Sequence, residues 1–228
     1  MYILSCAKHK NTRTILLLVS NFSRRVVLRF WAHDTPALWW DEGNNAYFAH
    51  QNFSNLVKMS RMTNDTDPPL HRLALRLWLG LLGDSAYNLR LLSVVCGVLT
   101  ILLAFAWGEW LDGPASGLLA ALLCAFSPLA IYYSREAKAY PFVTLFGALG
   151  LYVWSRYLFQ ADRRRPWLWV LYVICSVLAL GSHYYAVFLI AAQGAWLVIG
   201  SLARSKSFGD RRDLWRWLLA QAATILIM

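Results

Sequence analysis

The residues of this chain best suited to chemistry are a few carboxylates that stand beside aromatic residues and prolines. Asp41 and Glu42 follow two tryptophans in "LWWDEGNNAYF", and Glu136 lies in "YYSREAKAYPF". A carboxylate in such a place could act as a general base, orient a hydroxyl substrate or share a divalent metal ion. Because a charged side chain is costly in an apolar, membrane-like setting, we expect these acids to have a function.

Helix capping is a second explanation for Asp41 and Glu42. The segment 43–60 has the pattern of an amphipathic surface helix, and acidic side chains stabilise the positive N-terminus of a helix. The aromatic pair before them is typical of a membrane surface. A second acid, Glu136, on the same side of the membrane favours a catalytic role for Asp41 over capping alone.

Asp67 precedes Pro68 and Pro69 in "DPPLH", which predicts the start of a further helix because proline suits the first helical turn. Capping accounts for Asp67 by itself, and binding of a ligand or metal ion is the second possibility. The following segment, 68–83, places leucines at helical spacing with His71 and two arginines elsewhere, so we predict an amphipathic helix lying on the membrane.

The loop "SREAKAY" places two cations, Arg135 and Lys138, around Glu136, with Tyr140 after them. A local ion pair in a short loop would explain these charges. Two cations and an acid among tyrosines also suit a phosphate group that lies next to a hydroxyl substrate. His183, in "GSHYYAVF", is expected on the same side, where a histidine more often has a hydrogen-bonding role than a ligand role.

Composition indicates that membrane helices position these residues. The chain has 228 residues, of which 58% are hydrophobic, whereas soluble domains are about 45–50% apolar. The net charge of +10 comes from basic clusters between apolar runs, as in cytoplasmic loops, and not from one basic surface that would bind nucleic acid. The four cysteines show neither a CxxC pair nor Cys/His metal-site spacing and are interpreted as packing residues.

A helix that crosses a bilayer needs about 20 mostly apolar residues. Five runs satisfy this, and a sixth begins near Leu214. The segment 14–31 could be a first span, although Arg24, Arg25 and Arg29 interrupt it and would have to extend toward the membrane surface. The five runs are 88–108, 115–133, 141–159, 167–182 and 184–203.

Basic residues predict the orientation of these spans. With Arg163–Arg165 and the cluster 204–216 in the cytoplasm, 32–87 becomes a long first extracytoplasmic loop, and the acidic motifs share its side of the membrane. This register requires that 68–83 does not span. The predicted fold is all-α: a single polytopic transmembrane helical module over 1–228, with interfacial helices in 32–87.

The ordered combination of motifs over about residues 38–200 resembles the membrane glycosyltransferases of the GT-C type. It is most similar to the protein O-mannosyltransferase and lipid A aminoarabinose transferase superfamily, and the chain would form the N-terminal part of that fold. The resemblance rests on "WWDEGNNAYFA", "DPPLHRLALRLWLGLLGDSAYNLRLLSVVCGVLT", "SPLAIYYSREAKAY" and "SHYYAVFL".

The resemblance implies transfer of a sugar from a polyprenyl-phosphate donor to an acceptor hydroxyl at the extracytoplasmic face, with inversion. The expected catalytic residues are Asp41 and Glu136. Asp41 falls on the family's carboxylate that acts as base or substrate anchor, and Glu136 falls on the carboxylate of the second outside loop; Lys138 stands where arginine is more usual in the family. Substrate contacts would come from seven residues, and a divalent metal ion is a possible cofactor. These seven are Glu42, Asp67, Arg90, Arg135, Lys138, Tyr140 and His183.

Partners expected from this assignment are the lipid-linked donor and the bilayer, with no nucleic acid, and the expected location is a bacterial inner membrane. Family members are longer and have further spans, whereas this chain stops within its sixth predicted span. A non-catalytic truncated paralogue and a transporter of lipid-linked solutes are the alternatives. The sugar, the acceptor and the oligomeric state do not follow from the sequence.

Overall fold

A computed structural model describes residue 29 and the ranges 37–62, 68–159, 167–203 and 211–228. All the regular structure in this part of the chain is α-helical. Asp67 and the segment 14–28 lie outside the described residues, so the prediction of a first span is not addressed. The helices are α2 (Trp40–His50), α3 (Phe53–Met62), α4 (Leu70–Leu82), α5 (Ala86–Asp112), α6 (Pro114–Phe126), α7 (Pro128–Ser134), α8 (Tyr140–Phe159), α9 (Trp167–Leu180), α10 (Ala186–Ala203) and α11 (Arg211–Ile227).

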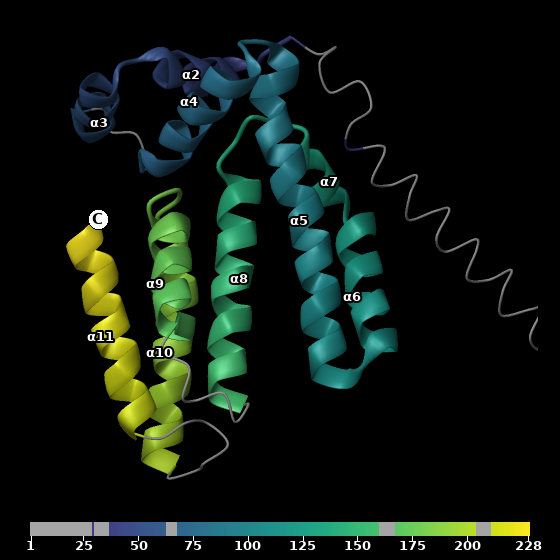
Figure 1. The fold of residues 1–228 in the computed structure, drawn as a ribbon, viewed down its shortest axis with the longest axis vertical. Coiled ribbons are helices and arrows are strands. Elements are labelled where there is room, and N and C mark those ends of the chain that lie inside the picture. Colours follow the sequence, from purple (N-terminus) through teal and green to yellow (C-terminus); the bar gives the residue numbers. More distant parts are fainter. Residues whose placement is uncertain (1–28, 30–36, 63–67, 160–166, 204–210) are drawn as a thin grey trace, which may run out of the picture.

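Long apolar helices form a bundle, and short helices lie across one of its ends (Figure 1). Within the described ranges α5, α8 and α10 are long and apolar enough to cross a membrane, and the bent pair α6–α7 makes a fourth candidate. Helix α9 is apolar but shorter. The prediction of an all-α, polytopic membrane fold is therefore confirmed.

The segment after the first tryptophan pair differs from the prediction of one helix over 43–60. Two helices are present, and Gln51 adopts an extended conformation (φ −69°, ψ 152°) at the end of α2. Asn52 caps the following turn, because its side chain accepts a hydrogen bond from the backbone N–H of Asn55 at 2.8 Å. Asp41 and Glu42 lie inside the first turn of α2 and not before it.

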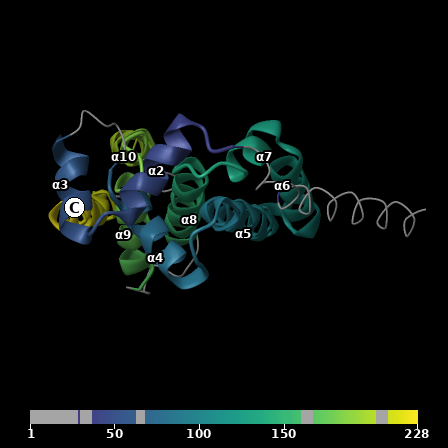
Figure 2. The same cartoon turned by 90° about the horizontal axis from the view of Figure 1, so that it is seen from above.

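Helix α4 is amphipathic, as predicted, and ends at Gly83, whose φ of +91° suits glycine. Leu77 and Leu81 are exposed on one face. The opposite face, which carries the arginines, packs on protein: Arg72 is buried, and its guanidinium lies 4.0 Å from the ring centre of Phe48 in α2. Figure 2, seen from above, shows α2 and α4 lying over the bundle end.

The predicted span 115–133 is two helices, α6 and α7, which meet at an angle of 61°. Ser127 is extended at the junction and caps α7, since its hydroxyl accepts from the N–H of Ala130 at 3.3 Å. Pro128 has no N–H and cannot continue the hydrogen bonding of α6. The break directs α7 into the "SREAKAY" loop at the same end of the bundle as α2 and α4 (Figure 1).

Small residues bring α5 and α6 together below this end. A Cβ atom on Gly108 would lie 2.8 Å from the carbonyl oxygen of Ser116 and 2.9 Å from the Cα of Gly117. The turn between these two helices uses Gly113, with a φ of +88°. Close backbone contact of this kind is typical of helix pairs in membranes, where small residues line the interface.

Candidate functional site

One end of the bundle carries α2, α4 and the "SREAKAY" loop. The best-defined interaction there joins α2 to α5 through Glu42 and Arg90. The Nε of Arg90 donates to Oε1 of Glu42 at 2.7 Å, and Nη2 donates to Oε2 at 2.6 Å. Both side chains are buried, with exposures of 1% and 3%. The backbone N–H of Ala137 also donates to Oε1, at 2.9 Å. This carboxylate therefore has partners on both oxygens and ties two helices to the "SREAKAY" loop.

These partners keep Glu42 ionised. Burial alone would raise the pKa of its carboxyl, but the hydrogen bonds and charge of Arg90, with the backbone N–H of Ala137, lower the pKa below its ordinary value. A carboxylate with a lowered pKa and hydrogen bonds on both oxygens is a poor general base. Through Ala137 it holds the loop in place.

A second polar link fixes the other side of the same loop. Asn45, one turn after Glu42 in α2, donates through Nδ2 to the carbonyl oxygen of Ala137 at 2.8 Å. The Oδ1 of Asn45 accepts from Nε of Arg72 in α4 at 3.1 Å. Consequently Ala137 is held through both its N–H and its C=O, and the charged residues on either side of it, Glu136 and Lys138, are fixed by the backbone.

Asp41 forms an ion pair with Lys138, across 97 positions of sequence. The carboxylate of Asp41 remains 40% exposed, whereas Lys138 is 11% exposed. The ammonium group also lies 5.0 Å from the ring centre of Trp39 and 5.9 Å from that of Tyr140. Asp41 is thus accessible to a substrate and lies beside a cation that is held among aromatic rings.

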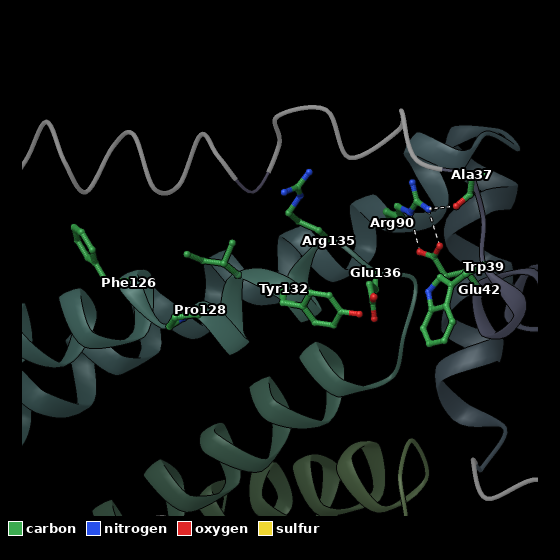
Figure 3. Close-up of a pocket in the computed structure, with 10 residues that line it drawn as sticks. Ala37, Trp39, Glu42, Arg90, Phe126, Pro128, Tyr132, Arg135 and Glu136 are labelled. Carbon is green, nitrogen blue, oxygen red and sulfur yellow. Dashed lines mark hydrogen bonds and ion pairs between the residues drawn. The ribbon is translucent and has the colours of Figure 1, made fainter.

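Glu136 and Arg135 face a different space, a cavity of about 670 Å³ (Figure 3). The hydroxyl of Tyr132 points toward Glu136, and Glu136 lies between Tyr132 and Trp39 in this view. Apolar side chains from α6 and α7 line one part of the cavity, and the Glu42–Arg90 pair lines another. The lining residues are Ala37, Trp39, Glu42, Arg90, Phe126, Pro128, Ile131, Tyr132, Arg135 and Glu136.

Aromatic rings continue from Tyr140 to the turn between α9 and α10. The rings of Tyr140 and His183 have centres 5.4 Å apart, and His183 and Tyr185 have centres 4.7 Å apart. The Nδ1 of His183 accepts from the N–H of Tyr185 at 3.2 Å, which fixes the imidazole. The α4 helix anchors this turn, because the N–H of Leu70 donates to the carbonyl oxygen of Gly181 at 2.9 Å.

His71 is a buried histidine beneath the loop. Its ring makes an edge contact with Phe142, at 5.9 Å between centres, and its Nε2 has no hydrogen-bond partner. Burial, with smaller contributions from the charges of Arg72 and Lys138, lowers the pKa of His71 to about 3. The imidazole is therefore neutral at physiological pH.

The predicted site residues consequently fall into two adjoining groups at one end of the bundle. Asp67 belongs to neither group, because it lies outside the described residues. Trp39, Asn45 and Tyr132 were not among the predicted residues, although the tryptophan pair was a visible signal. One group is Asp41, Lys138, Tyr140 and His183; the other, around the cavity, is Glu42, Arg90, Arg135 and Glu136.

A metal site of protein ligands alone is not evident in the described part of the chain, where no three His, Cys, Asp or Glu side chains are close enough to share an ion. Asp41 and His183 belong to the same group, and Lys138 and Tyr140 connect them. The predicted contribution of Asp67 to a metal site is not addressed.

Comparison with known proteins supports the predicted family and fold. The family model for dolichyl-phosphate-mannose-protein mannosyltransferases matches residues 66–228. The fold is similar to a chain in the structure of the S. cerevisiae protein O-mannosyltransferase Pmt1-Pmt2 complex bound to the sugar donor, with a TM-score of 0.62 and 16% sequence identity. None of the curated proteins compared with the chain matches it.

The structural match covers 94% of this chain and 32% of the yeast chain, so the present chain spans about a third of that protein's length. At this identity the likeness concerns the fold alone, which is that of the GT-C mannosyltransferases. The family model, by contrast, matches well over half of the sequence, including "DPPLHR", "SREAKAY" and "SHYY". The chain belongs to the dolichyl-phosphate-mannose-protein mannosyltransferase family.

Proposed function

We propose that this chain contains the residues with which a membrane glycosyltransferase binds its sugar donor and its acceptor and transfers the sugar. A hydroxyl oxygen of the acceptor attacks the anomeric carbon of a sugar that is linked to polyprenyl phosphate. The bond from that carbon to the phosphate oxygen breaks, the polyprenyl phosphate leaves with the bonding electron pair, and the hydroxyl proton passes to a carboxylate. One such displacement inverts the anomeric centre.

The observation that carries the proposal is the ion pair between Asp41 and Lys138. It places a partly exposed carboxylate next to a cation, from two motifs 97 positions apart, at the bundle end where Glu136 also lies. A carboxylate suits proton removal from the acceptor, and a nearby cation suits the charge that develops on the leaving phosphate. Family membership supports a sugar donor of the polyprenyl-phosphate type.

We assign the roles of the remaining residues from their contacts. Asp41 is the base, and Lys138 with Arg135 stabilises the phosphate. Glu136 orients a sugar or acceptor hydroxyl. Glu42 and Arg90 hold the loop instead of binding substrate, because two hydrogen bonds join their charged groups. This differs from the substrate contacts expected for these two residues from the sequence.

The cavity suits an amphipathic donor. Phe126, Pro128 and Ile131 supply apolar surface, and Glu136 and Arg135 supply charge in the same cavity. An isoprenoid chain can lie against the apolar part while its phosphosugar remains at the membrane surface, near the charged residues. Basic segments at the opposite helix ends support an extracytoplasmic site, and in a bacterium the membrane would be the inner one.

The test is sugar transfer in membranes that contain the full-length protein, with a radiolabelled polyprenyl-phosphate sugar. Asp41→Asn should lower the transfer rate by about 100-fold or more, because the base is lost while size and hydrogen bonding are nearly kept. Glu136→Gln should raise the donor or acceptor KM. Asp84→Asn is the matched control, since Asp84 is an exposed acid at the same end, paired with His50 at 3.2 Å.

The proposal fails if Asp41→Asn transfers sugar at the wild-type rate. It also fails if Asp41→Asn loses activity only in proportion to a loss of inserted protein, because that result would assign the residue to helix capping. Membrane abundance is therefore measured for every variant.

A further inference from the structure

The break between α6 and α7 leaves a backbone carbonyl without its usual donor. In a continuous helix the carbonyl oxygen of Cys124 would accept from the N–H of residue 128, but this residue is Pro128. Ser127 is extended, and the two helices diverge by 61°. In apolar surroundings such an orphaned carbonyl must find another donor or it destabilises the fold.

Arg29 supplies that donor from a distant part of the sequence. Its Nη2 donates to the carbonyl oxygen of Cys124 at 3.3 Å. Its Nη1 donates to the carbonyl oxygen of Ala130 at 2.9 Å and to Oγ of Ser134 at 2.9 Å. One planar guanidinium thus binds the last turn of α6 and two positions of α7, on both sides of the break. The side chain is 1% exposed.

Helix α5 is shaped to admit this contact. A Cβ atom on Gly97 would lie 2.8 Å from Nη1 of Arg29 and 2.8 Å from Cβ of Ser134. Only glycine leaves room for both groups against the α5 backbone. Gly97 therefore offers a second way to disturb the contact without removing the charge.

Helix α7, which Arg29 binds, carries several of the residues that line the cavity. Pro128, Ile131 and Tyr132 of α7 line the 670 Å³ cavity, and Arg135, which ends α7, lines it as well. Ala130 and Ser134, the residues that Arg29 binds, do not line it. Glu136 follows directly. The position of α7 therefore sets where Tyr132 and Arg135 lie in the cavity and, together with the bonds of Ala137, where Glu136 lies.

We propose that Arg29 is a positioning residue: its guanidinium replaces the backbone donor missing at Pro128 and holds α7 so that Arg135 and Glu136 face the cavity. Arg29 acts through α7 and does not touch the substrate. The effect on sugar transfer rests on the proposed function, whereas the effect on the geometry of α7 does not.

The test combines a distance measurement with kinetics in the full-length protein, reconstituted in lipid nanodiscs. Spin labels are placed at Leu111 in α5 and Leu129 in α7, both exposed, in a background without other cysteines. Arg29→Met and Gly97→Ala should each shift or broaden the distance distribution between the labels. Arg29→Lys should have an intermediate effect, because one ammonium cannot reach three separated acceptors in the same geometry.

Thr100→Ala is the matched control. Thr100 lies one turn beyond Gly97 in α5, and its hydroxyl donates only within its own helix, to the carbonyl oxygen of Cys96 at 2.8 Å. Its distance distribution should remain that of the wild type. In the kinetic arm, Arg29→Lys and Gly97→Ala should lower kcat/KM for sugar transfer by about 10- to 100-fold, as small misplacements of binding groups do, while Thr100→Ala keeps the wild-type value.

A wild-type distance distribution in both Arg29→Lys and Gly97→Ala overturns the claim that Arg29 holds α7, whatever the activity. A changed distribution with unchanged kcat/KM overturns the positioning role. If the wild-type protein transfers no sugar, the proposed function fails, and the distance measurement still decides whether Arg29 holds α7. Arg29→Met alone does not decide the result should it fail to insert, since Gly97→Ala perturbs the same contact.

Discussion

Glu42 and Arg90 form a two-pronged ion pair, with hydrogen bonds of 2.7 and 2.6 Å, in which both side chains are almost fully buried. The pair connects α2 with α5 and, through the N–H of Ala137, with the loop that carries Glu136 and Lys138. It therefore couples the stability of the bundle end to the geometry of the charged residues proposed to bind substrate.

Removal of one member should be strongly destabilising. Glu42→Gln or Arg90→Gln leaves the partner's charge buried without compensation, which costs about 3–5 kcal/mol. The free energy of unfolding, measured by denaturant titration in detergent, should fall by that amount. The double variant Glu42→Met/Arg90→Met should lose less than either single variant, because no charge remains buried. Single variants as stable as the wild type would contradict the role given to this pair.

Stability should also depend on pH through His71. The ordinary pKa of 6.5 falls to about 3 in the folded protein, so between these values the unfolded chain binds a proton that the folded chain does not. The stability is fully present above about pH 6.5 and is lost as the pH falls, by at most about 1.4 kcal/mol per unit. Thermal midpoints measured from pH 8 to pH 4 should show this slope.

His71→Gln should remove much of that slope, since glutamine does not titrate. Glu42 contributes in the same direction but at lower pH: its pKa is lowered, so its stabilisation is present above its unfolded pKa of about 4.5 and is lost as the pH falls through the folded value. An equal slope between pH 6.5 and pH 5 in the wild type and His71→Gln would show that another group titrates there.

Much of this architecture followed from pattern alone. Apolar length predicted α5, α8 and α10, and amphipathic spacing predicted α4 as a helix that does not span. The bend in the predicted span 115–133 could have been predicted as well, because Ser127-Pro128 is a common signal for a helix end and a new helix start. The break at Gln51 and Asn52 has a weaker signal, the capping ability of Asn52.

The partners of the charged residues could not be predicted, because they depend on which helix faces lie together. Arg90 was expected among the substrate contacts, and its pairing with Glu42 at the cavity did not follow from the sequence. Arg29 was counted only as an interruption of an apolar run, although it binds α7. Arg72, on the polar face of α4, packs on Phe48 and not in water. Sequence patterns therefore predicted most of the helices, whereas tertiary packing decides the partner of each charged side chain.

Lys138 should tolerate arginine but not a neutral residue. Lys138→Arg keeps the positive charge beside Asp41 and offers a two-pronged contact to a carboxylate or phosphate, so sugar transfer should stay within about threefold of the wild type. Lys138→Met keeps much of the side-chain volume but loses the charge and should lower the transfer rate by about 100-fold. Equal activity of both variants would remove Lys138 from the proposed phosphate contacts.

Close packing of α5 on α6 predicts a contrast between two glycines. Gly108→Ala places a Cβ atom 2.8 Å from the Ser116 carbonyl oxygen, so the helices must separate, at a cost of about 1–3 kcal/mol. Gly80→Ala, in α4, meets nothing within 4 Å and should stabilise that helix by about 0.5–1 kcal/mol. Thermal midpoints in detergent should therefore move in opposite directions. Midpoints lowered equally would argue against tight contact between α5 and α6.

The extracytoplasmic site depends on a prediction of which side of the membrane each end of the bundle faces. Trp40, in the first turn of α2, and Phe159, the last residue of α8, are both exposed, and Figure 1 places their helix ends at opposite ends of the bundle. In a cysteine-free background, a membrane-impermeant maleimide added to intact cells should label Trp40→Cys at once. It should label Phe159→Cys only after permeabilisation, because the arginines at 163–165 favour the cytoplasm.

Each other pattern of labelling has a definite meaning. Labelling of both cysteines in intact cells would mean that α8 does not cross the membrane, although its 20 residues and apolar composition suit a span. The reverse pattern would place Asp41 and Lys138 in the cytosol, where the sugar donor would have to be presented from the inner leaflet. The ion pair would remain, but the acceptor would then have to be a cytosolic hydroxyl.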